Sequence, residues 1–152
     1  MTVRIQSEPF DVSTELSALH GGDTSVGAIA AFVGTVREAA SAGALSLTLE
    51  HYPGMTEDAL DAIIEDARAR FDLIDCLIVH RVGKLLAAEA IVLVAVTSAH
   101  RKVAFQACEF VMDFLKTRAP FWKKETTRDG SNWVAARESD EEAANDWDKR
   151  HG

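Results

Sequence analysis

The feature that most constrains the fold of this chain lies between residues 45 and 127, where strand-like and helix-like hydrophobic patterns follow one another in a definite order. Apolar and polar side chains alternate in residues 45–52, which is typical of a strand with one buried face. From Leu60 to Phe71 the apolar side chains recur every three or four positions, which indicates an amphipathic helix. Similar patterns predict strands at 74–82 and 89–97, a helix at 99–117 and an extended segment at 121–127.

This strand, helix, strand, strand, helix, strand order is the split β-α-β order of ferredoxin-like folds. It predicts an α+β domain in which helices cover one face of a mainly antiparallel sheet. At the N-terminus, residues 2–6 fit a strand and residues 11–20 a short helix. Residues 27–36 are apolar on both faces, so we expect a central strand with both faces covered.

The boundaries of the two long helices are expected at polar and helix-breaking residues. Thr56 is the expected N-cap of the first helix, with Glu57 and Asp58 beside its positive end. Ser98 is the expected cap of the second helix, and Pro120 ends it because proline lacks an N–H and clashes with the preceding turn. Gly83 is expected to join the two middle strands.

Two lysines flank the turn that Pro120 forces. Lys116 and Lys123 lie seven positions apart in the segment FLKTRAPFWKKE, interleaved with aromatic side chains. The turn can bring their ammonium groups together, and ammonium groups held against apolar walls can act as acids or as clamps for anions. A lysine at a helix C-terminus also suits the helix dipole, so Lys116 is explicable without a catalytic role.

His100 and Arg101 open the second long helix, where backbone N–H groups already favour anions. Cations at this end oppose the dipole preference, which hints at function, although a solvated first turn remains an alternative. Sixteen residues at about 1.5 Å each place His100 roughly 24 Å from Lys116. We therefore expect either two sites or one site shared by two copies in a symmetric dimer, and we favour the shared site.

Other polar residues carry weaker signals. Arg37 follows an apolar strand and could hold a phosphate, and Arg137 has the same status, but a surface role is the simpler interpretation of each. His51 and His80 lie in strand-like apolar contexts, where a structural histidine is favoured over a metal ligand. No motif for a metal, a nucleotide or another cofactor is visible.

Composition limits the possible functions. The 152 residues fit a single domain over residues 1–140 followed by an acidic, solvated tail over 141–152. The net charge of −8 argues against general nucleic-acid binding. No signal peptide or membrane span is visible, and Cys76 and Cys108 have apolar neighbours that predict buried thiols, so a cytoplasmic location is expected.

Several separate motifs, in order, resemble the large, catalytic subunit of molybdopterin synthase over roughly residues 25–140. They are AFVGTVRE (31–38), LTLEHYPGM (47–55), HRVG (80–83), SAHRKVAF (98–105), FLKTRAPFWKKE (114–125) and SNWVAARES (131–139). The resemblance implies an α/β hammerhead fold, which is compatible with the ferredoxin-like order. It also implies a homodimer within a heterotetramer that contains a small ubiquitin-like subunit.

The resemblance implies a sulfurtransferase of molybdenum cofactor biosynthesis. Sulfur from the C-terminal Gly-Gly thiocarboxylate of the small subunit would pass to cyclic pyranopterin monophosphate and form the molybdopterin dithiolene. Carried onto this sequence, Lys116 and Lys123 match the catalytic lysines. The expected substrate-binding positions are Arg37, His100, Arg101, Lys124, Glu125 and, with less support, Arg137.

Two other function classes stay open on the residues alone. An RNA-binding module would need exposed aromatic side chains and a basic face, yet the chain is acidic and has no RNP-like run. A scaffold that only docks a partner's tail along a sheet edge is a third possibility, but it leaves the spacing of Lys116 and Lys123 unexplained.

Overall fold

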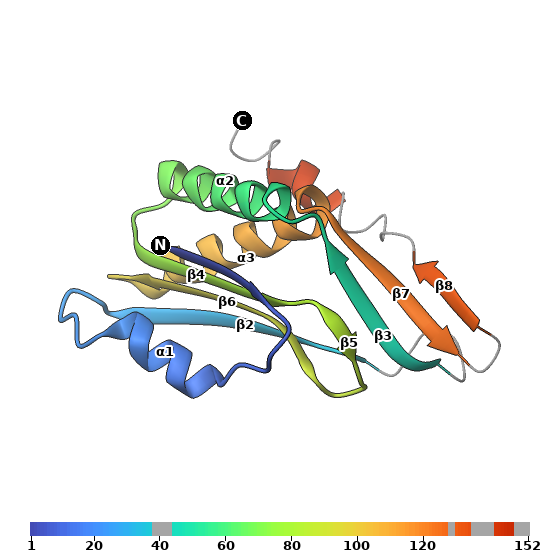
Figure 1. Ribbon diagram of the computed structural model, residues 1–152. Helices are drawn as coiled ribbons and strands as arrows, with labels where there is room; N and C mark the ends of the chain where they lie inside the picture. The colour runs from blue at the N-terminus through green and yellow to red at the C-terminus, as the bar shows by residue number, and fades with distance from the viewer. Residues whose placement is uncertain (38–43, 128–129, 135–141, 148–152) are drawn as a thin grey trace.

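The computed structural model describes residues 1–37, 44–127, 130–134 and 142–147. Figure 1 shows two sheets side by side, with helices on both faces of the first. Of the helices within the described ranges, none is long and apolar enough to cross a membrane. The labelled elements are β1 (Thr2–Gln6), α1 (Val12–His20), β2 (Ala28–Thr35), β3 (Ala44–His51), α2 (Met55–Arg70), β4 (Leu73–Arg81), β5 (Gly83–Leu85), β6 (Ala90–Ser98), α3 (Arg101–Arg118), β7 (Phe121–Thr127) and β8 (Gly130–Val134).

The first sheet has the strand order β1-β4-β6-β2 and forms the centre of the molecule. β1 pairs with β4 in parallel, while β6 pairs antiparallel with both β4 and β2. Nearly every residue of β4 and β6 is buried, because α2 and α3 cover one face of this sheet and α1 packs against the other. The apolar runs in these two strands therefore reflect burial on both faces.

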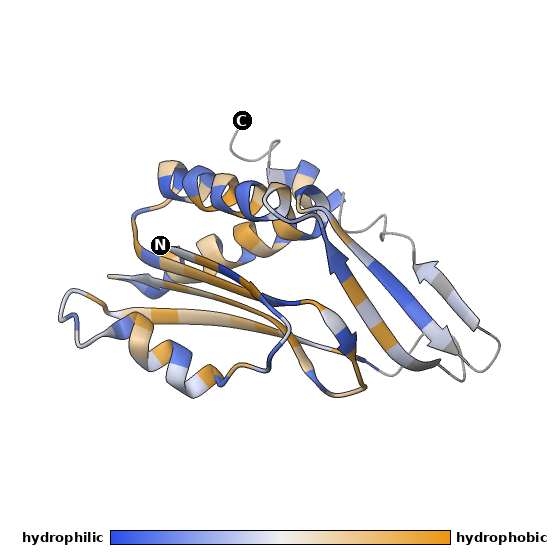
Figure 2. Cartoon of the chain, viewed as in Figure 1, coloured by the Kyte–Doolittle hydropathy of each residue, from blue (hydrophilic) through white to orange (hydrophobic). Residues whose placement is uncertain are grey.

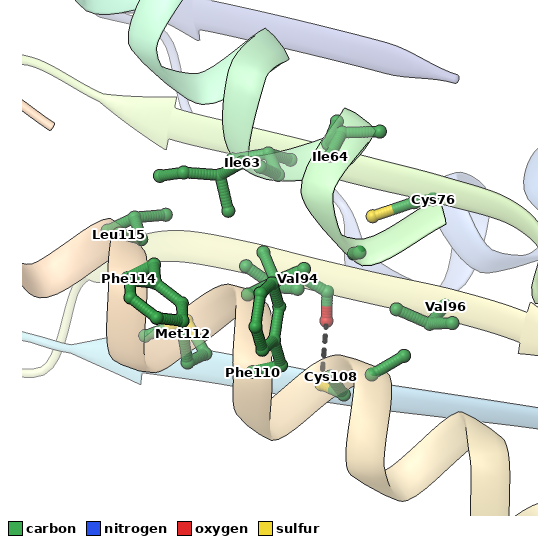
Figure 3. Close-up of a cluster of buried hydrophobic side chains, with 14 of the residues drawn as sticks. Ile63, Ile64, Cys76, Val94, Val96, Cys108, Phe110, Met112, Phe114 and Leu115 are labelled. Atoms are coloured by element: carbon green, nitrogen blue, oxygen red, sulfur yellow. Dashed lines mark hydrogen bonds between the residues drawn. The ribbon is translucent and has the colours of Figure 1, made fainter. Parts of the chain in front are cut away.

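The main core lies between the first sheet and the helices α2 and α3 (Figure 3). Phe110 of α3 is at its centre, and its ring lies 4.6 Å from the ring of Phe114 and 5.6 Å from that of Phe71. Cys108 also faces the sheet, and its thiol donates to the carbonyl of Val94 at 3.7 Å. The predicted amphipathic character of both long helices is confirmed by this packing.

The second sheet has the order β5-β3-β7-β8 and is entirely antiparallel over its described pairings. The α+β class and the mainly antiparallel pairing are thus confirmed. One detail differs from a single ferredoxin-like sheet, because β3 and β7 pair with each other in a separate sheet. The short strand β5, which begins just after Val82, crosses from the first sheet to the second, where the sequence predicts only a connection at Gly83.

The prediction of a covered central strand at residues 27–36 is wrong. β2 is the last strand of the first sheet and pairs only with β6 among the described strands. Its side chains Ile29, Phe32 and Val33 remain between 38% and 41% exposed. Apolar character on both faces of β2 is therefore not explained by burial against the described residues of this chain.

Both predicted helix caps are also wrong. Gly54 is the N-cap of α2, and Thr56 lies inside the first turn with no exposed surface. His100 is the N-cap of α3, whereas Ser98 ends β6 and its hydroxyl donates to the carbonyl of Asp72 at 3.1 Å. In both places the hydroxyl bonds to a distant segment, which local sequence rules cannot anticipate.

The acidic C-terminal region is not wholly solvated. Residues 142–147 form a helix in which Ala144 and Trp147 are 6% and 2% exposed. The Trp147 ring packs edge-on against Phe110, and its N–H donates to a carboxylate oxygen of Asp113 at 2.5 Å. The expectation of a solvated end fails for these residues because one tryptophan supplies enough apolar surface to dock the helix.

Candidate functional site

The turn between the two lysines is held by a side chain from α2. The buried hydroxyl of Thr56 donates to the carbonyl of Pro120 at 2.9 Å and accepts from the backbone N–H of Tyr52 at 2.9 Å. It therefore ties the end of β3 and the start of α2 to the turn that leads from α3 into β7. The expected turn at Pro120 is confirmed, with α3 ending at Arg118 and β7 beginning at Phe121.

The two faces of β7 carry different chemistry. Phe121, Lys123 and Glu125 share one face, because alternate residues of a strand point the same way. On that face Lys123 is opposite Leu49, which is buried together with Val36 and Leu85. The Lys123 side chain is itself exposed, so its ammonium group lies at the solvent edge of an apolar cluster.

Lys124 points to the opposite face of β7. There it pairs with Thr48 and Trp133, and its ammonium group lies 5.6 Å from the centre of the Trp133 ring. Within one chain the strand geometry therefore separates Lys124 from Lys123. Figure 2 shows the hydrophilic stretch of β7 beside β3, along which hydrophilic and hydrophobic residues alternate.

His80 lies where the segments that carry the two lysines meet. It is 5% exposed, and its ring stacks on Phe121 with centroids 3.8 Å apart and an interplanar angle of 15°. Its Nδ1 bonds the carbonyl of Arg81 at 2.8 Å; a carbonyl only accepts, so Nδ1 carries the proton. The prediction of a satisfied structural histidine is confirmed for this residue.

The pKa of His80 is lowered to about 4, mainly by burial and also by the charges of Lys116, Lys123 and His51, while the hydrogen bond to the Arg81 carbonyl opposes the shift. The ring is therefore neutral near pH 7. The charges of Lys116 and Lys123 thus both act on this one buried imidazole. The turn at Pro120 joins the two segments that carry these lysines, α3 and β7.

Arg37 lies near the same apolar cluster. It directly follows Val36, whose side chain packs with Leu49, the cross-strand partner of Lys123. The N–H of Val36 donates to the carbonyl of Glu89 at 2.8 Å, which fixes the backbone just before Arg37. The Arg37 side chain is exposed, so its guanidinium is accessible beside the sheet that carries Lys123.

His100 and Arg101 lie at the other end of α3. Both are exposed, and α3 runs without interruption from Arg101 to Arg118. The separation of roughly 24 Å from Lys116 therefore holds within one chain. The structure does not bring these two residues to the lysine pair, and Arg137 lies outside the described residues.

The thiols and potential metal ligands form no second site in the described part of the chain. Cys76 and Cys108 are buried, as predicted, and burial raises their pKa values to about 12 and about 11. Such thiols are poor nucleophiles near neutral pH. Across the ranges that the structure describes, no three His, Cys, Asp or Glu side chains gather as metal ligands.

Sequence reasoning missed two contacts of this site. Period-2 alternation puts His80 on the same face of β4 as Cys76 and Ile78, but its stacking on Phe121 joins residues 41 positions apart. The bond from Thr56 to Pro120 joins residues 64 positions apart. The only sequence signal for either was the motif HRVG at 80–83, which gives no partner.

Known proteins resemble this chain both in sequence and in fold. The MoaE protein family matches residues 5–118. The molybdopterin synthase catalytic subunit of Ralstonia nicotianae is 54% identical over 147 residues, which cover 96% of this chain and 84% of that protein.

Two solved structures have the same fold. The molybdopterin biosynthesis MoaE protein from Burkholderia ambifaria has a TM-score of 0.84 at 52% identity over 97% of each chain. Molybdopterin synthase from Staphylococcus aureus has a TM-score of 0.80 at 34% identity, covering 87% of this chain and 96% of that chain. On the extent and identity of these matches, the chain belongs to the MoaE protein family.

Proposed function

We propose that this chain is the catalytic subunit of a molybdopterin synthase. It transfers sulfur from the C-terminal glycine thiocarboxylate of a small ubiquitin-like partner to cyclic pyranopterin monophosphate. The observation that carries the proposal is the turn at Pro120, which joins the end of α3 that carries Lys116 to the start of β7 that carries Lys123. The relatives named molybdopterin synthase catalytic subunit support the same assignment.

The chemistry requires a cationic site, because the thiocarboxylate and the phosphate are both anions. In each of two successive transfers, the sulfur of one thiocarboxylate forms a bond to a side-chain carbon of the pyranopterin while the oxygen on that carbon leaves as water. Hydrolysis then frees the partner with a carboxylate at its C-terminus. Lys116 and Lys123 stabilise the negative charge that develops during these steps, and Arg37 binds the phosphate.

His100 and Arg101 contribute from a second copy of the chain. The edge strand β2 exposes Ile29 and Val33 on one face and Phe32 on the face that α3 covers, and Phe105 of α3 is exposed as well, so another copy can cover this edge of the molecule. Phe105 lies one helical turn beyond Arg101, so this surface adjoins the start of α3. A two-fold dimer through this face would bring the cations of one copy toward the lysines of the other.

Lys124, Glu125 and Arg137 complete the proposed binding set. Glu125 shares the face of Lys123 on β7, whereas Lys124 reaches the opposite face, where it can meet a partner rather than the same pocket. The protein is proposed to work in the cytoplasm. It needs no resident metal or cofactor in this scheme, since every charge required is supplied by side chains.

The test is reconstitution with cyclic pyranopterin monophosphate and a thiocarboxylated partner. Dithiolene formation is expected with the full-length partner, and none with a partner that lacks the Gly-Gly tail, although binding persists in part through the interface body. Turnover that survives removal of the tail would exclude this chain as a thiocarboxylate acceptor.

Shared sites can be tested by mixing two inactive variants, Lys116→Ala and Arg101→Ala. One of the two sites in a mixed dimer keeps both residues, so part of the activity should return. Proven subunit exchange without any recovery of activity would refute the shared site.

A further inference from the structure

His80 occupies a junction between the two sheets. On β4 it faces the side covered by α2 and α3, in register with Ile5 of β1 and Val92 of β6. Its 5% exposure leaves the ring almost no access to solvent. A polar aromatic side chain in this position is costly unless its groups are bonded, and Nδ1–H meets that need through the Arg81 carbonyl.

The stack on Phe121 connects His80 to Lys123. Phe121 is the first residue of β7, and Lys123 follows two positions later on the same face of the strand. A near-parallel contact at 3.8 Å fixes the plane of the Phe121 ring and hence the direction in which β7 leaves the Pro120 turn. Lys116 lies in the last turn of α3, and its charge acts on the same imidazole.

Charged groups on three elements act on His80. Lys116 on α3, Lys123 on β7 and His51 on β3 each lower its pKa, while the hydrogen bond to the Arg81 carbonyl raises it. An imidazolium at this point would place a further cation beside the two ammonium groups. An uncharged ring lets both lysines stay close without that repulsion.

We propose that His80 is a positioning residue for sulfur transfer: its flat ring holds Phe121 and thereby sets the place of Lys123 relative to Lys116. It neither binds substrate nor transfers a proton. The inference rests on the proposed function of the lysine pair. It adds that residue 80 must have a planar ring that stacks on Phe121 at the start of β7.

Three substitutions of His80 distinguish the effect of its ring from the effect of its hydrogen bond. His80→Phe keeps a flat ring and loses the N–H, His80→Asn keeps a donor for the Arg81 carbonyl and loses the ring, and His80→Ala loses both. Each is assayed as the full complex with the thiocarboxylated partner, at a temperature where melting curves show the variant to be folded. Phe121→Leu removes the stack from the other side and serves as the matched variant.

The expected result is a loss in kcat without a comparable change in KM. His80→Asn, His80→Ala and Phe121→Leu should each lose about 10²-fold in kcat, which is the effect of misplacing a catalytic group by about 1 Å. KM for the pyranopterin should stay within about three-fold, and His80→Phe should retain kcat within about three-fold. A kcat for His80→Phe as low as that of His80→Ala would overturn the proposal.

The pH profile distinguishes positioning from proton transfer. Between pH 6 and 9 the profiles of kcat for the unaltered protein and for His80→Phe should have the same shape. Loss of a limb of the profile in His80→Phe would make His80 a proton donor or acceptor and would also overturn the proposal.

Crystal structures of the variants test the inference without any measurement of turnover. In crystal structures, Lys123 should be displaced relative to Lys116 in His80→Ala and unmoved in His80→Phe. If the unaltered complex forms no dithiolene, the proposed function fails while this comparison still tests the role of His80. Unmoved lysines in His80→Ala would refute it.

Discussion

The two sheets of this protein differ in how they are covered. In the first sheet, β4 and β6 are buried on both faces between α1 on one side and α2 with α3 on the other. In the second sheet only one face is apolar, and β7 exposes Trp122 and Lys123 to solvent. The comparison teaches that stability is concentrated in the first sheet, whereas the proposed chemistry uses the second.

α3 is the element that serves both regions. Its middle supplies Phe110, Val111 and Phe114 to the core, and its two ends carry the candidate site residues. A rigid, well-packed helix keeps those ends at a fixed separation, which is useful when two copies must share a site. Substitutions in the core should therefore lower stability with little effect on turnover, and substitutions of the candidate site residues should lower turnover with little effect on stability.

The largest expected effect is on stability, from Phe110→Ala in the core. This ring is 1% exposed and contacts Phe71, Phe114 and Trp147, so its removal leaves a cavity. Urea unfolding should report a loss of about 3–5 kcal/mol in the free energy of unfolding. Turnover per folded molecule should change little, because the lysine pair lies outside the cavity.

Glu109→Ala is the matched control for this substitution, since Glu109 is exposed on the same helix. It should change the free energy of unfolding by less than about 0.5 kcal/mol. Equal effects of the two substitutions would break the contrast between the core and the surface of α3.

The opposite signature is expected for Lys116→Ala and Lys123→Ala. Each removes an ammonium group that is proposed to stabilise developing charge, so kcat should fall about 10²–10³-fold, equivalent to about 3–4 kcal/mol. Stability should stay within about 0.5 kcal/mol because both side chains are exposed. The assay is dithiolene formation with thiocarboxylated partner.

Lys84→Ala is the control from the same sheet. Lys84 is exposed on β5 and pairs with Thr48, which places it on the face opposite to Lys123. Turnover should be unchanged. Near-parental activity in both Lys116→Ala and Lys123→Ala would contradict the catalytic assignment of the two lysines.

A pH effect of intermediate size is expected at the boundary between the sheets. The pKa of His80 falls from 6.5 to about 4 on folding, so the unfolded chain binds more protons in that interval. The stability that depends on neutral His80 is present above pH 6.5 and is lost as the pH falls toward 4. The full loss is on the order of 3 kcal/mol.

Urea unfolding at pH 7.5 and pH 4.5 measures this loss. His80→Phe should reduce the difference between the two pH values, because phenylalanine does not titrate. His20→Gln, on α1, retains His80 and should keep the difference. An unchanged difference in His80→Phe would assign the acid sensitivity to other groups.

The smallest expected effect concerns the bond between α2 and the Pro120 turn. Thr56→Val preserves shape but leaves the Pro120 carbonyl and the Tyr52 N–H without their partner, at a cost of about 1–3 kcal/mol. Thr56→Ser should restore most of that stability. Because the turn orients β7, kcat should also fall several-fold in the valine variant and recover in the serine variant. Equal stability of the two variants would show that the hydroxyl is unimportant.

The sequence patterns predicted the strands and helices well wherever the buried side chains follow one period, either that of a strand or that of a helix. The alternation in 45–52 and the helical repeat from Leu60 to Phe71 correspond to β3 and α2. Prediction failed where a residue's neighbours come from a distant segment. β2 is an exposed edge strand despite its apolar sequence, and Thr56 and Ser98 bond remote carbonyls instead of capping helices.

The candidate site divides in the same way. Pro120 and the spacing of Lys116 and Lys123 predicted a turn that joins two ammonium groups, because proline acts locally on the backbone. The sequence by itself determined the elements, the turn and the separation of His100 from Lys116 along one helix. Only the tertiary structure decided that β3 and β7 form a separate sheet, that Lys123 and Lys124 face opposite ways relative to the core, and that His80 supports Phe121. These contacts join residues far apart in the chain, and packing chooses among partners that the local sequence leaves equivalent.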